Sequence, residues 1–446
     1  MPAWLDAVIE AILSDSRGKT VWVAYSGGLD SHVLLHGLAT ANKLSNVRLK
    51  AVHINHQLQA DAKKWGQHCQ ATAQELAVEL ALIDVTITAR DKRGTEAAAR
   101  QARYAALANV LSAGDMMLTA HHQQDQAETI LLQLLRGAGP KGLAAMPVLM
   151  PLGLGQLYRP LLAVSQQELR RYAAYHHLSW INDPSNTDTH FDRNYLRKIL
   201  WPLISERWPS AEKTLSRSAR HCADSDNLLQ QLAQQDILAI AADKVGQGIL
   251  PIAGLLSLPA VRARNVLRYM IARQGRELPS TARLDAILKH VCRAREDKQP
   301  EITWPGGIIR RYRQQLFCLD NQPTYPFISE CLTAPKSLDL SSGQHIDWAL
   351  CTKVGISMQQ FQQGIRIRSR RHGDRIQLIG RKHHHQLKRL WQTWSVPPWM
   401  RDEIPLIVQG ETILAVVGYG WSCHCLLAEG ETGYQVKVTG VTPPID

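Results

Sequence analysis

Residues 19–41 read KTVWVAYSGGLDSHVLLHGLATA, and this stretch decides the fold of the N-terminal part of the chain. Residues 19–25 form a short apolar run with β-branched members, which is typical of a buried strand, and residues 32–41 have the apolar spacing of a helix. The Gly-Gly pair between them lets the backbone turn sharply. Free N–H groups at the start of a helix favour a bound anion. Residues 26–31 therefore predict an anion-binding loop between a strand and a helix.

The same alternation of strand and helix patterns continues to about residue 136. Further strand patterns cover residues 47–54, 82–87 and 116–119, and further helix patterns cover residues 61–80, 95–111 and 125–136. Strands that alternate with helices of this length indicate a parallel sheet with right-handed crossovers, so we predict a Rossmann-like α/β fold. Ligands of such sheets bind beyond the carboxyl ends of the strands. Ser26, His53 and His121 fall at those ends.

The rest of the chain differs in texture, and we predict four regions in all. Residues 1–211 form the α/β domain, which includes a Gly- and Pro-rich loop or lid without strands at residues 137–155. Residues 212–320 form a mostly helical domain, and residues 321–345, with their prolines, form a linker. Residues 346–446 have short strand patterns and one helix pattern, which predicts a small, basic α+β domain.

Charge and composition limit the classes of function. The chain has 446 residues, of which 45% are hydrophobic, so it can bury several hydrophobic cores. Its net charge of +12 favours a polyanionic partner such as nucleic acid. A basic protein without such a partner is the alternative. No apolar run is long enough to span a bilayer, so no membrane partner is expected. The eight cysteines are scattered, which favours a reducing cytoplasm over a disulfide framework. Both a monomer and a homodimer are compatible with the sequence.

The loop at residues 26–31 lacks the lysine of a Walker motif and the spacing of a dinucleotide fingerprint. It resembles the loop of the PP-loop ATP pyrophosphatases, and this resemblance implies that the chain binds ATP and splits it to AMP and pyrophosphate. Asp30 is the one acidic residue of the loop, and we expect it to position Mg²⁺ or the nucleotide; a helix N-terminal charge is the alternative. The predicted ATP-binding residues are Ser26, Gly27, Gly28, Leu29, Asp30, Ser31, His53 and Ile54.

A second polar cluster follows the strand pattern at residues 116–119. Asp125 and Glu128 are three residues apart, so a helix places both carboxylates on one face, with His121 at the strand end. Acids at a helix start can simply favour the helix dipole. Carboxylates beside a strand end can instead hold Mg²⁺, or bind and deprotonate an ammonium substrate. On the preceding helix, Arg100 could clamp a phosphate or could be a surface residue.

Six segments together point to one family within the PP-loop ATP pyrophosphatases. With these segments, the resemblance covers the whole chain. They are similar to segments of the bacterial tRNA(Ile)-lysidine synthetases. These segments are SGGLDS (26–31), HINH (53–56), EAAARQARY (96–104), HHQQDQAETILLQLLRGAG (121–139), FDRNYLRKILWPL (191–203) and a C-terminal run from GIRIRSRRHGD to IPLIVQG (364–410). The chain departs from the family after HINH. The family usually has a glycine after the last histidine of this motif, whereas residues 56–60 of this chain read HQLQA.

The resemblance implies a specific reaction. ATP would adenylate O2 of cytidine 34 in a tRNA(Ile) with a CAU anticodon, and the amine of free L-lysine would then attack C2 and displace AMP. The resemblance also implies that Asp125 and Glu128 bind or activate lysine and that Arg100 lies near the phosphate or the adenylate. His121 would support the same step. Which of the two acids acts as the base stays open.

The C-terminal region carries the signal for a tRNA partner. Residues 364–401 contain ten Lys or Arg and one Asp, with Trp391, Trp394 and Trp399 between them. Arginines beside aromatic rings suit phosphate contact and base stacking, although a solvated basic face is the alternative. The predicted tRNA-binding residues are Arg193, Arg197, Arg366, Arg368, Arg370, Arg371, Lys388 and Arg389.

Three rival functions share parts of this pattern. A PP-loop tRNA thiolase needs sulfur chemistry, but the chain has no C-x-x-C motif and Cys69 stands alone in the α/β domain. A small-molecule synthetase of the same superfamily would not need the basic C-terminal region. A non-catalytic tRNA-binding protein would not need the intact loop or the spacing of Asp125 and Glu128.

Overall fold

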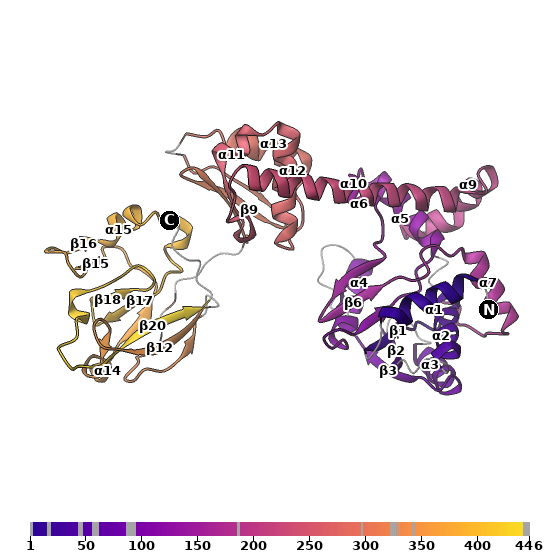
Figure 1. Cartoon of the computed structure of the whole chain (residues 1–446), viewed down its shortest axis with the longest axis horizontal. Helices are drawn as coiled ribbons and strands as arrows, with labels where there is room; N and C mark the ends of the chain where they lie inside the picture. The colour runs from indigo at the N-terminus through magenta and orange to yellow at the C-terminus, as the bar shows by residue number, and fades with distance from the viewer. Residues whose placement is uncertain are drawn as a thin grey trace. The chain divides into compact units, whose positions relative to one another are not determined.

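The computed structural model describes residues 3–15, 19–42, 48–55, 62–85, 95–184, 188–295, 298–321, 327, 329, 331–340 and 344–439. The chain forms two compact units, residues 1–232 and 233–446 (Figure 1), each of which we describe by itself. The division lies inside the helix α10 (Ala211–Ala239), whose first residue lies at the domain boundary expected from the sequence. In the described part of the chain, no helix combines the length and apolar content that a membrane span requires.

A six-stranded sheet in the order β3-β2-β1-β4-β6-β5 forms the centre of the N-terminal unit. All neighbouring strands are parallel except β5 and β6, which confirms the predicted Rossmann-like sheet. The strands are β1 (Thr20–Ala24), β2 (Arg48–Asn55), β3 (Glu79–Asp84), β4 (Met116–Leu118), β5 (Leu149–Leu152) and β6 (Gly155–Tyr158).

The prediction that residues 137–155 form a strandless loop or lid is wrong for its last part. Residues 149–152 form β5, which pairs with β6 in a hairpin. Pro151 is compatible with β5 because this strand is at the edge of the sheet, where a missing N–H group breaks no ladder. Gly153 has φ of +55°, a left-handed conformation that a tight hairpin turn requires. Gly and Pro therefore mark the turn and the edge here rather than the absence of strands.

Helices cover both faces of this sheet (Figure 1), with α2 and α3 on one side and α4 on the other. Val33, Leu34 and Leu35 of α2 are fully buried against β1, which explains why the apolar run after the loop forms a helix on this face. Leu107 of α4 is buried on the opposite face. The helices are α1 (Ala3–Asp15), α2 (Leu29–Asn42), α3 (Ala62–Glu75), α4 (Thr95–Asn109), α5 (Gln123–Leu135), α6 (Pro140–Leu143), α7 (Gln166–Tyr175), α8 (Asp192–Tyr195), the π-helix η2 (Leu196–Leu200) and α9 (Trp201–Arg207).

The first part of the C-terminal unit packs helices against a four-stranded antiparallel sheet in the order β7-β10-β9-β8. The expected helical domain thus also contains a sheet. Its strands are β7 (Ile249–Pro251), β8 (Glu301–Trp304), β9 (Gly307–Tyr312) and β10 (Gln315–Leu319). Its helices are the 3₁₀-helix η3 (Val245–Gln247), α11 (Ile252–Ser257), α12 (Ala260–Arg273), α13 (Thr281–Ala286) and the π-helix η4 (Ile287–Val291).

The last part of the chain is a small α+β region, as predicted, with two α-helices where one was expected. Two four-stranded sheets have the orders β11-β12-β20-β13 and β14-β17-β18-β19, and β15 pairs with β16. The strands are β11 (Leu338–Asp339), β12 (His345–Cys351), β13 (Ile356–Ser357), β14 (Arg366–Arg368), β15 (Arg375–Ile376), β16 (His385–Gln386), β17 (Leu406–Gln409), β18 (Thr412–Val416), β19 (Gly420–Trp421) and β20 (Gly433–Thr439). The helices are α14 (Met358–Gln362), α15 (Leu387–Thr393), and the 3₁₀-helices η5 (Pro398–Met400) and η6 (Cys423–Cys425).

Candidate active site

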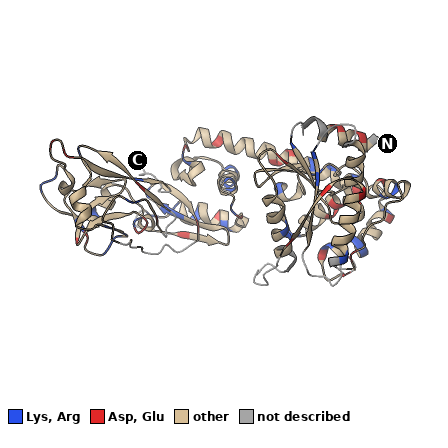
Figure 2. Ribbon diagram, turned by 90° about the horizontal axis from the view of Figure 1, so that it is seen from below, with Lys and Arg blue, Asp and Glu red and all other residues tan. Residues whose placement is uncertain are grey.

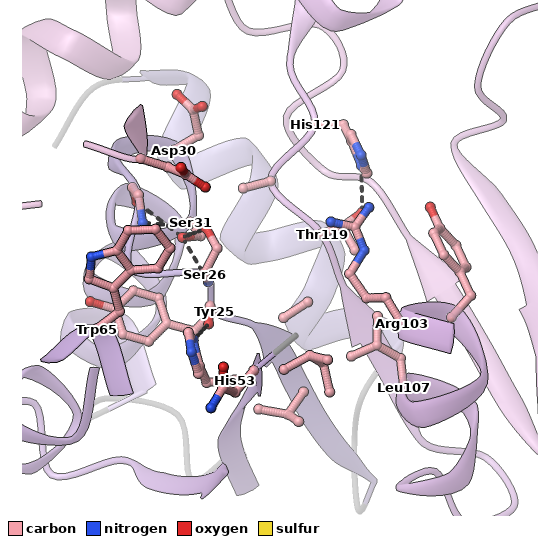
Figure 3. Close-up of a pocket in the computed structure, with 18 of the residues that line it drawn as sticks. Tyr25, Ser26, Asp30, Ser31, His53, Trp65, Arg103, Leu107, Thr119 and His121 are labelled. Atoms are coloured by element: carbon pink, nitrogen blue, oxygen red, sulfur yellow. Dashed lines mark hydrogen bonds between the residues drawn. The ribbon is translucent and has the colours of Figure 1, made fainter. Parts of the chain in front are cut away.

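A cavity of about 480 Å³ lies at the carboxyl ends of β1, β2 and β4, where the fold predicts a ligand. Small-molecule sites usually measure about 300–1,000 Å³. Figure 3 shows the loop residues Asp30, Ser26 and Ser31 on one side of the cavity and His121 and Arg103 on the other. The predicted site residues that line it are Ser26, Gly28, Asp30, Ser31, His53, Ile54, His121 and Asp125. Gly27, Leu29, Arg100 and Glu128 are not in the lining.

Hydrogen bonds within the loop hold it in a closed shape. The Ser31 hydroxyl donates to the Gly28 carbonyl at 3.0 Å and accepts from the Ser26 N–H at 3.2 Å. Gly27 has φ of +82°, and a Cβ atom there would lie 2.6 Å from Cδ1 of Ile181. Only glycine fits this position, because both the backbone angle and the neighbouring side chain exclude a larger residue. Gly27, Ser26 and Ser31, which belong to the predicted loop, therefore set its shape.

His53 lies beneath the loop at the end of β2. Its Nδ1 is 2.9 Å from the carbonyl oxygen of Tyr25, so this nitrogen carries the proton and donates. Burial lowers the pKa of His53, although its bond to Tyr25 opposes this. The Cys69 sulfur lies 3.4 Å from the same nitrogen and is fully buried, and burial raises its pKa to about 12. Such a thiol is a poor nucleophile. His56, the last residue of the predicted HINH segment, lies outside the described residues.

Asp125 and Glu128 share one face of α5, as their spacing predicts, and two arginines from the helix after residue 191 hold them. Arg193 donates from Nε to Glu128 at 3.0 Å and from Nη2 to Asp125 at 2.8 Å. Arg197 donates to Glu128 at 2.7 and 2.8 Å and to Asp125 at 3.0 Å. We call these four residues the arginine clamp. The two arginines were predicted as tRNA contacts; in this structure they are hydrogen-bonded to the acid pair.

The clamp keeps Asp125 charged despite its burial. Burial raises the pKa of the Asp125 carboxyl, but the electrostatic interaction with His122 and the positive charges of Arg193 and Arg197 outweigh it and lower the pKa to about 2. Burial lowers the pKa of Arg197, whereas Glu128 and Asp125 raise it, with a net rise. Both groups are therefore ionised near neutral pH. The exposed fraction of the Glu128 side chain is 0%, and its carboxylate oxygens lie against Arg193 and Arg197.

His122 joins the clamp to the loop. Its Nε2 atom lies 3.6 Å from Oδ2 of Asp30 and 3.5 Å from Oδ2 of Asp125. The other carboxylate oxygen of Asp30, Oδ1, is buried and has no hydrogen-bond partner among the described residues. Burial raises the pKa of Asp30, and the charge of His122 opposes this rise. The loop and the acid pair thus form one connected site.

His121 and Arg103 face the cavity from the other side. His121 Nδ1 is 2.9 Å from the Thr119 hydroxyl, and burial lowers the pKa of His121 to about 3, so the ring is neutral at physiological pH. Arg103 lines the cavity, and among the described residues no carboxylate pairs with it. Arg100, which the sequence favoured, is exposed and lies over the ring of Tyr104 at 5.0 Å.

The structure places Arg103, and not the predicted Arg100, in the cavity lining. Arg100 and Arg103 are one helical turn apart, and spacing alone does not say which of them turns toward the sheet. Trp65, Tyr104, Thr119 and Asp183 also line the cavity and were not predicted as site residues. Thr119 could have been found, because it directly follows β4 at the carboxyl edge of the sheet.

The predicted tRNA-binding residues of the C-terminal unit divide into two groups. Arg368 is buried and pairs with Asp374 at 2.9 Å, and Arg370 pairs with Asp402 at 2.9 Å. The exposed residues of the predicted set are Arg366, Arg371, Lys388 and Arg389. Figure 2 shows Lys and Arg on both units, so the positive charge is not confined to the C-terminal region.

The expectation that the tryptophans of this region stack on bases fails for Trp391. Its side chain is 1% exposed and packs in the core. The reason is that α15 is amphipathic, with Leu387, Leu390 and Trp391 on its buried face.

Three segments of the chain match known protein families. Residues 4–204 match a PP-loop domain, residues 250–317 match the TilS substrate binding domain, and residues 365–438 match the TilS substrate C-terminal domain. A solved structure of a TilS C-terminal domain is 20% identical in sequence and covers 26% of this chain and 99% of its own, with a TM-score of 0.22.

Whole-length relatives share one name. The tRNA(Ile)-lysidine synthase of Coxiella burnetii is 41% identical over 438 residues, which cover 97% of this chain and 96% of that protein. The tRNA(Ile)-lysidine synthase of Alkalilimnicola ehrlichii is 40% identical over 418 residues, which cover 92% of this chain and 91% of that protein. Identity of this level over nearly the whole of both chains confirms the predicted resemblance, and the chain therefore belongs to the tRNA(Ile)-lysidine synthase family.

Proposed function

We propose that this enzyme uses ATP to join free L-lysine to C2 of cytidine 34 in a tRNA(Ile) whose anticodon is CAU. The observation that carries the proposal is that one cavity borders both the loop of residues 26–31 and Asp125 of the arginine clamp. A phosphate-binding loop suits ATP, and a pair of carboxylates suits an ammonium group. The names of the relatives support lysidine as the product. A reducing cytoplasm, where these substrates occur together, is the proposed compartment.

In the first half of the reaction, O2 of the cytidine attacks the α-phosphorus of ATP. A P–O bond forms, and pyrophosphate leaves. We assign the departing phosphates to the loop, where the N–H groups at the start of α2 and the hydroxyls of Ser26 and Ser31 can donate to them. Arg103 has no carboxylate partner in the described part of the chain, so its charge is available to the developing negative charge.

Asp30 fits a Mg²⁺ ion. Its buried Oδ1 atom has no hydrogen-bond partner among the described residues, and a carboxylate oxygen is a ligand that Mg²⁺ prefers. No group of three or more His, Cys, Asp or Glu in the described ranges could hold a metal without a substrate. This agrees with Mg²⁺, which is commonly held by one or two carboxylates together with substrate phosphates. The ion, when bound, would neutralise charge on the phosphates.

In the second half, the lysine amine attacks C2, a C–N bond forms, and O2 leaves with AMP. We infer that Asp125 and Glu128 bind the lysine ammonium group. Their oxygens are occupied by Arg193 and Arg197 in the free enzyme, so lysine must displace part of the clamp. While the arginines are bound, an Asp125 carboxylate of pKa about 2 is a weak base. Release of the arginines raises that pKa and makes the carboxylate a better acceptor for the proton that lysine must lose.

A direct assay tests the proposal. The protein is mixed with labelled lysine, ATP and Mg²⁺ and with a tRNA(Ile) transcript bearing CAU, and a transcript bearing GAU is the matched control. We expect label only in the CAU transcript, with one AMP formed per lysine. The proposal fails if neither transcript is labelled while AMP forms on another substrate. Asp30→Asn should stop AMP formation and leave the affinity for tRNA within about twofold, because Asp30 is proposed to act on the nucleotide.

A further inference from the structure

Tyr104 lines the cavity, but the proposed reaction gives it no role. It directly follows Arg103 in α4, and Figure 3 shows Arg103 on the side of the cavity opposite Ser26 and Ser31. A tyrosine brings an apolar ring and one hydroxyl to a site, and the hydroxyl can both donate and accept a hydrogen bond. What Tyr104 can do for a ligand therefore depends on the partners of its hydroxyl oxygen and on the direction of its proton.

Two arginines contact the oxygen of this hydroxyl. Arg100, one turn earlier on α4, donates from Nη2 at 3.4 Å, and Arg159, directly after β6, donates from Nη2 at 3.5 Å. Both distances are long for a hydrogen bond, so the contacts are mainly electrostatic. A guanidinium group has no acceptor atom, so neither arginine can take the hydroxyl proton. The oxygen of Tyr104 thus faces two donors, and its proton stays available for an acceptor in the cavity.

The surroundings of Tyr104 also polarise its hydroxyl. Burial raises the pKa of Tyr104, but the charge of Arg100, the hydrogen bond and charge of Arg159 and the charge of Arg103 outweigh it, so the pKa lies below the ordinary value of a tyrosine. Among the described residues, no carboxylate neutralises these three arginines. A hydroxyl beside several cations is a stronger donor than an ordinary phenol, and an anionic acceptor suits it best.

The two arginines differ in how firmly the protein holds them. The Arg159 side chain is buried, and its Nη1 atom donates to the carbonyl oxygen of Pro147 at 2.6 Å. Arg100 is exposed, and its guanidinium group lies 5.0 Å from the centre of the Tyr104 ring. Arg159 is therefore an anchored support for the hydroxyl, whereas Arg100 can be replaced without the loss of a buried contact.

We propose that Tyr104 is a catalytic residue that donates a hydrogen bond to a non-bridging oxygen of the α-phosphate of ATP, and that Arg100 and Arg159 act through it as positioning residues. The inference rests on the proposed function, in which AMP is transferred to the cytidine. In that step the bond between O2 and the α-phosphorus forms, the bond from this phosphorus to the pyrophosphate oxygen breaks, and Tyr104 keeps its proton.

The α-phosphate is the anion that the cavity brings to this side. It is bonded to the phosphates that we assign to the loop, and Tyr104 belongs to the side of the cavity opposite that loop. Negative charge is spread over the equatorial oxygens of the phosphorus in the transition state. A fixed, polarised donor therefore stabilises the transition state more than it stabilises bound ATP. The loop would hold the leaving pyrophosphate while Tyr104 holds the group that is transferred.

Tyr104→Phe removes the hydroxyl and keeps the ring. In a single turnover with the CAU transcript, ATP and Mg²⁺ but no lysine, pyrophosphate release should slow on the order of 10²-fold, which is usual for one lost donor to a transition-state anion. The melting temperature should fall by no more than about 4 °C, because the lost contacts are long and a hydrogen bond contributes little net stability. Tyr175→Phe, at an exposed tyrosine of α7, is the matched control and should change neither value. Slower lysine incorporation with unchanged pyrophosphate release would overturn the proposal.

Sulfur substitution in ATP tests the contact with the α-phosphate itself. In each of the two diastereomers of the α-thio analogue of ATP, a sulfur atom, which is a weak acceptor, replaces one non-bridging oxygen of the α-phosphate. One diastereomer should react more slowly than ATP with the wild type, and most of that difference should disappear in Tyr104→Phe. Unchanged ratios for both diastereomers would overturn the proposal. A coupling seen instead with a transcript that carries a phosphorothioate before cytidine 34 would also overturn it, because Tyr104 would then contact the RNA backbone.

Arg100→Gln is a second variant that removes no buried contact. If Arg100 acts through Tyr104, this variant should slow pyrophosphate release less than Tyr104→Phe does. It should have no further effect, within about twofold, in the Tyr104→Phe background. Losses that multiply would overturn the positioning role of Arg100. If Tyr104→Phe does not fold, the ratios for the two diastereomers are measured in Arg100→Gln, and unchanged ratios there would overturn the proposal.

The wild type keeps this test separate from the proposed function. If the wild type neither releases pyrophosphate nor incorporates lysine with the CAU transcript, the proposed function fails. If the wild type is active and Tyr104→Phe matches it, only the role of Tyr104 fails.

Discussion

Glu128→Ala tests the balance of charges in the arginine clamp. The Glu128 carboxylate accepts hydrogen bonds from Arg193 at 3.0 Å, from Arg197 at 2.7 and 2.8 Å and from Gln124 at 3.1 Å. The variant leaves two arginines against a single acid, Asp125. Removal of one partner of a buried ion pair costs about 3–5 kcal/mol. The arginine side chains are 28% and 33% exposed, so water screens part of the charge, and we expect the lower limit, about 3 kcal/mol.

Scanning calorimetry of the whole chain measures this cost. For a unit of this size, 1 kcal/mol shifts a melting temperature by about 2–4 °C, so the transition of the N-terminal unit should fall by roughly 6–12 °C. That transition can be recognised because Val33→Ala, a change in the fully buried face of α2, lowers it as well. Glu206→Ala, which removes an exposed acid from α9, should leave it within about 1 °C.

The second half of the test also removes the arginine charge that Glu128→Ala leaves without a carboxylate partner. In Glu128→Ala combined with Arg197→Met, one acid faces one arginine again, so the melting temperature should recover part of the loss. A further fall in the double variant would show that the two losses are independent. A drop of less than about 2 °C in Glu128→Ala alone would refute the reasoning, because it would mean that the clamp is solvated in solution.

Three further predictions follow from the same geometry. Gly27→Ala should lower both the melting temperature and the affinity for ATP measured by calorimetry, because Gly27 has φ of +82° and a Cβ there would lie 2.6 Å from a side-chain carbon. Gly28 does not have a positive φ, so Gly28→Ala is the control and should fold normally. The stability that the clamp draws from Asp125, whose pKa is lowered from 3.8 to about 2, is present above about pH 4 and lost as the pH falls toward 2; the melting temperatures of wild type and Asp125→Asn should therefore converge over that range. Arg371→Gln should reduce the slope of log affinity for tRNA against log salt concentration by about 1, whereas Arg368→Gln should instead lower stability because it breaks a buried pair.

The sheet and the loop could be predicted because their signals are local. A strand, a Gly-Gly turn and a helix lie within 23 residues, so this segment alone predicts the geometry of the loop. Parallel strands then bring their carboxyl ends to one edge of the sheet. The hairpin of β5 and β6 was missed because its Pro151 and Gly153 are breakers in most contexts. Their effect depends on whether the strand is at an edge, and that is a property of the sheet and not of the segment.

The arginine clamp could not be predicted for a different reason. Arg193 and Arg197 are 65 or more residues from their acids, and no local pattern connects the two segments. In the sequence, the two arginines look like part of a basic helix. Because the net charge of the chain is positive, any basic helix in it is readily interpreted as a nucleic-acid contact. The same ambiguity made Trp391 resemble a stacking residue, although its neighbours Leu387 and Leu390 place it on the buried face of α15. Charge and aromatic content therefore predict a partner for the chain more reliably than they predict which residues touch it.

The clamp also constrains the order of events in the proposed reaction. Asp125 and Glu128 cannot hold a lysine ammonium group and both arginines with the same oxygens, so the affinity for lysine is reduced by the cost of opening the clamp. Arginines released from the carboxylates need another anion, and an RNA phosphate pairs with a guanidinium in the same two-pronged way. If Arg193 and Arg197 contact tRNA as the sequence predicts, then tRNA and lysine favour each other's binding, and by linkage each must raise the other's affinity by the same factor. The two arginines then have two states, one paired with the acids and one in their predicted contact with tRNA. The two assignments therefore do not compete.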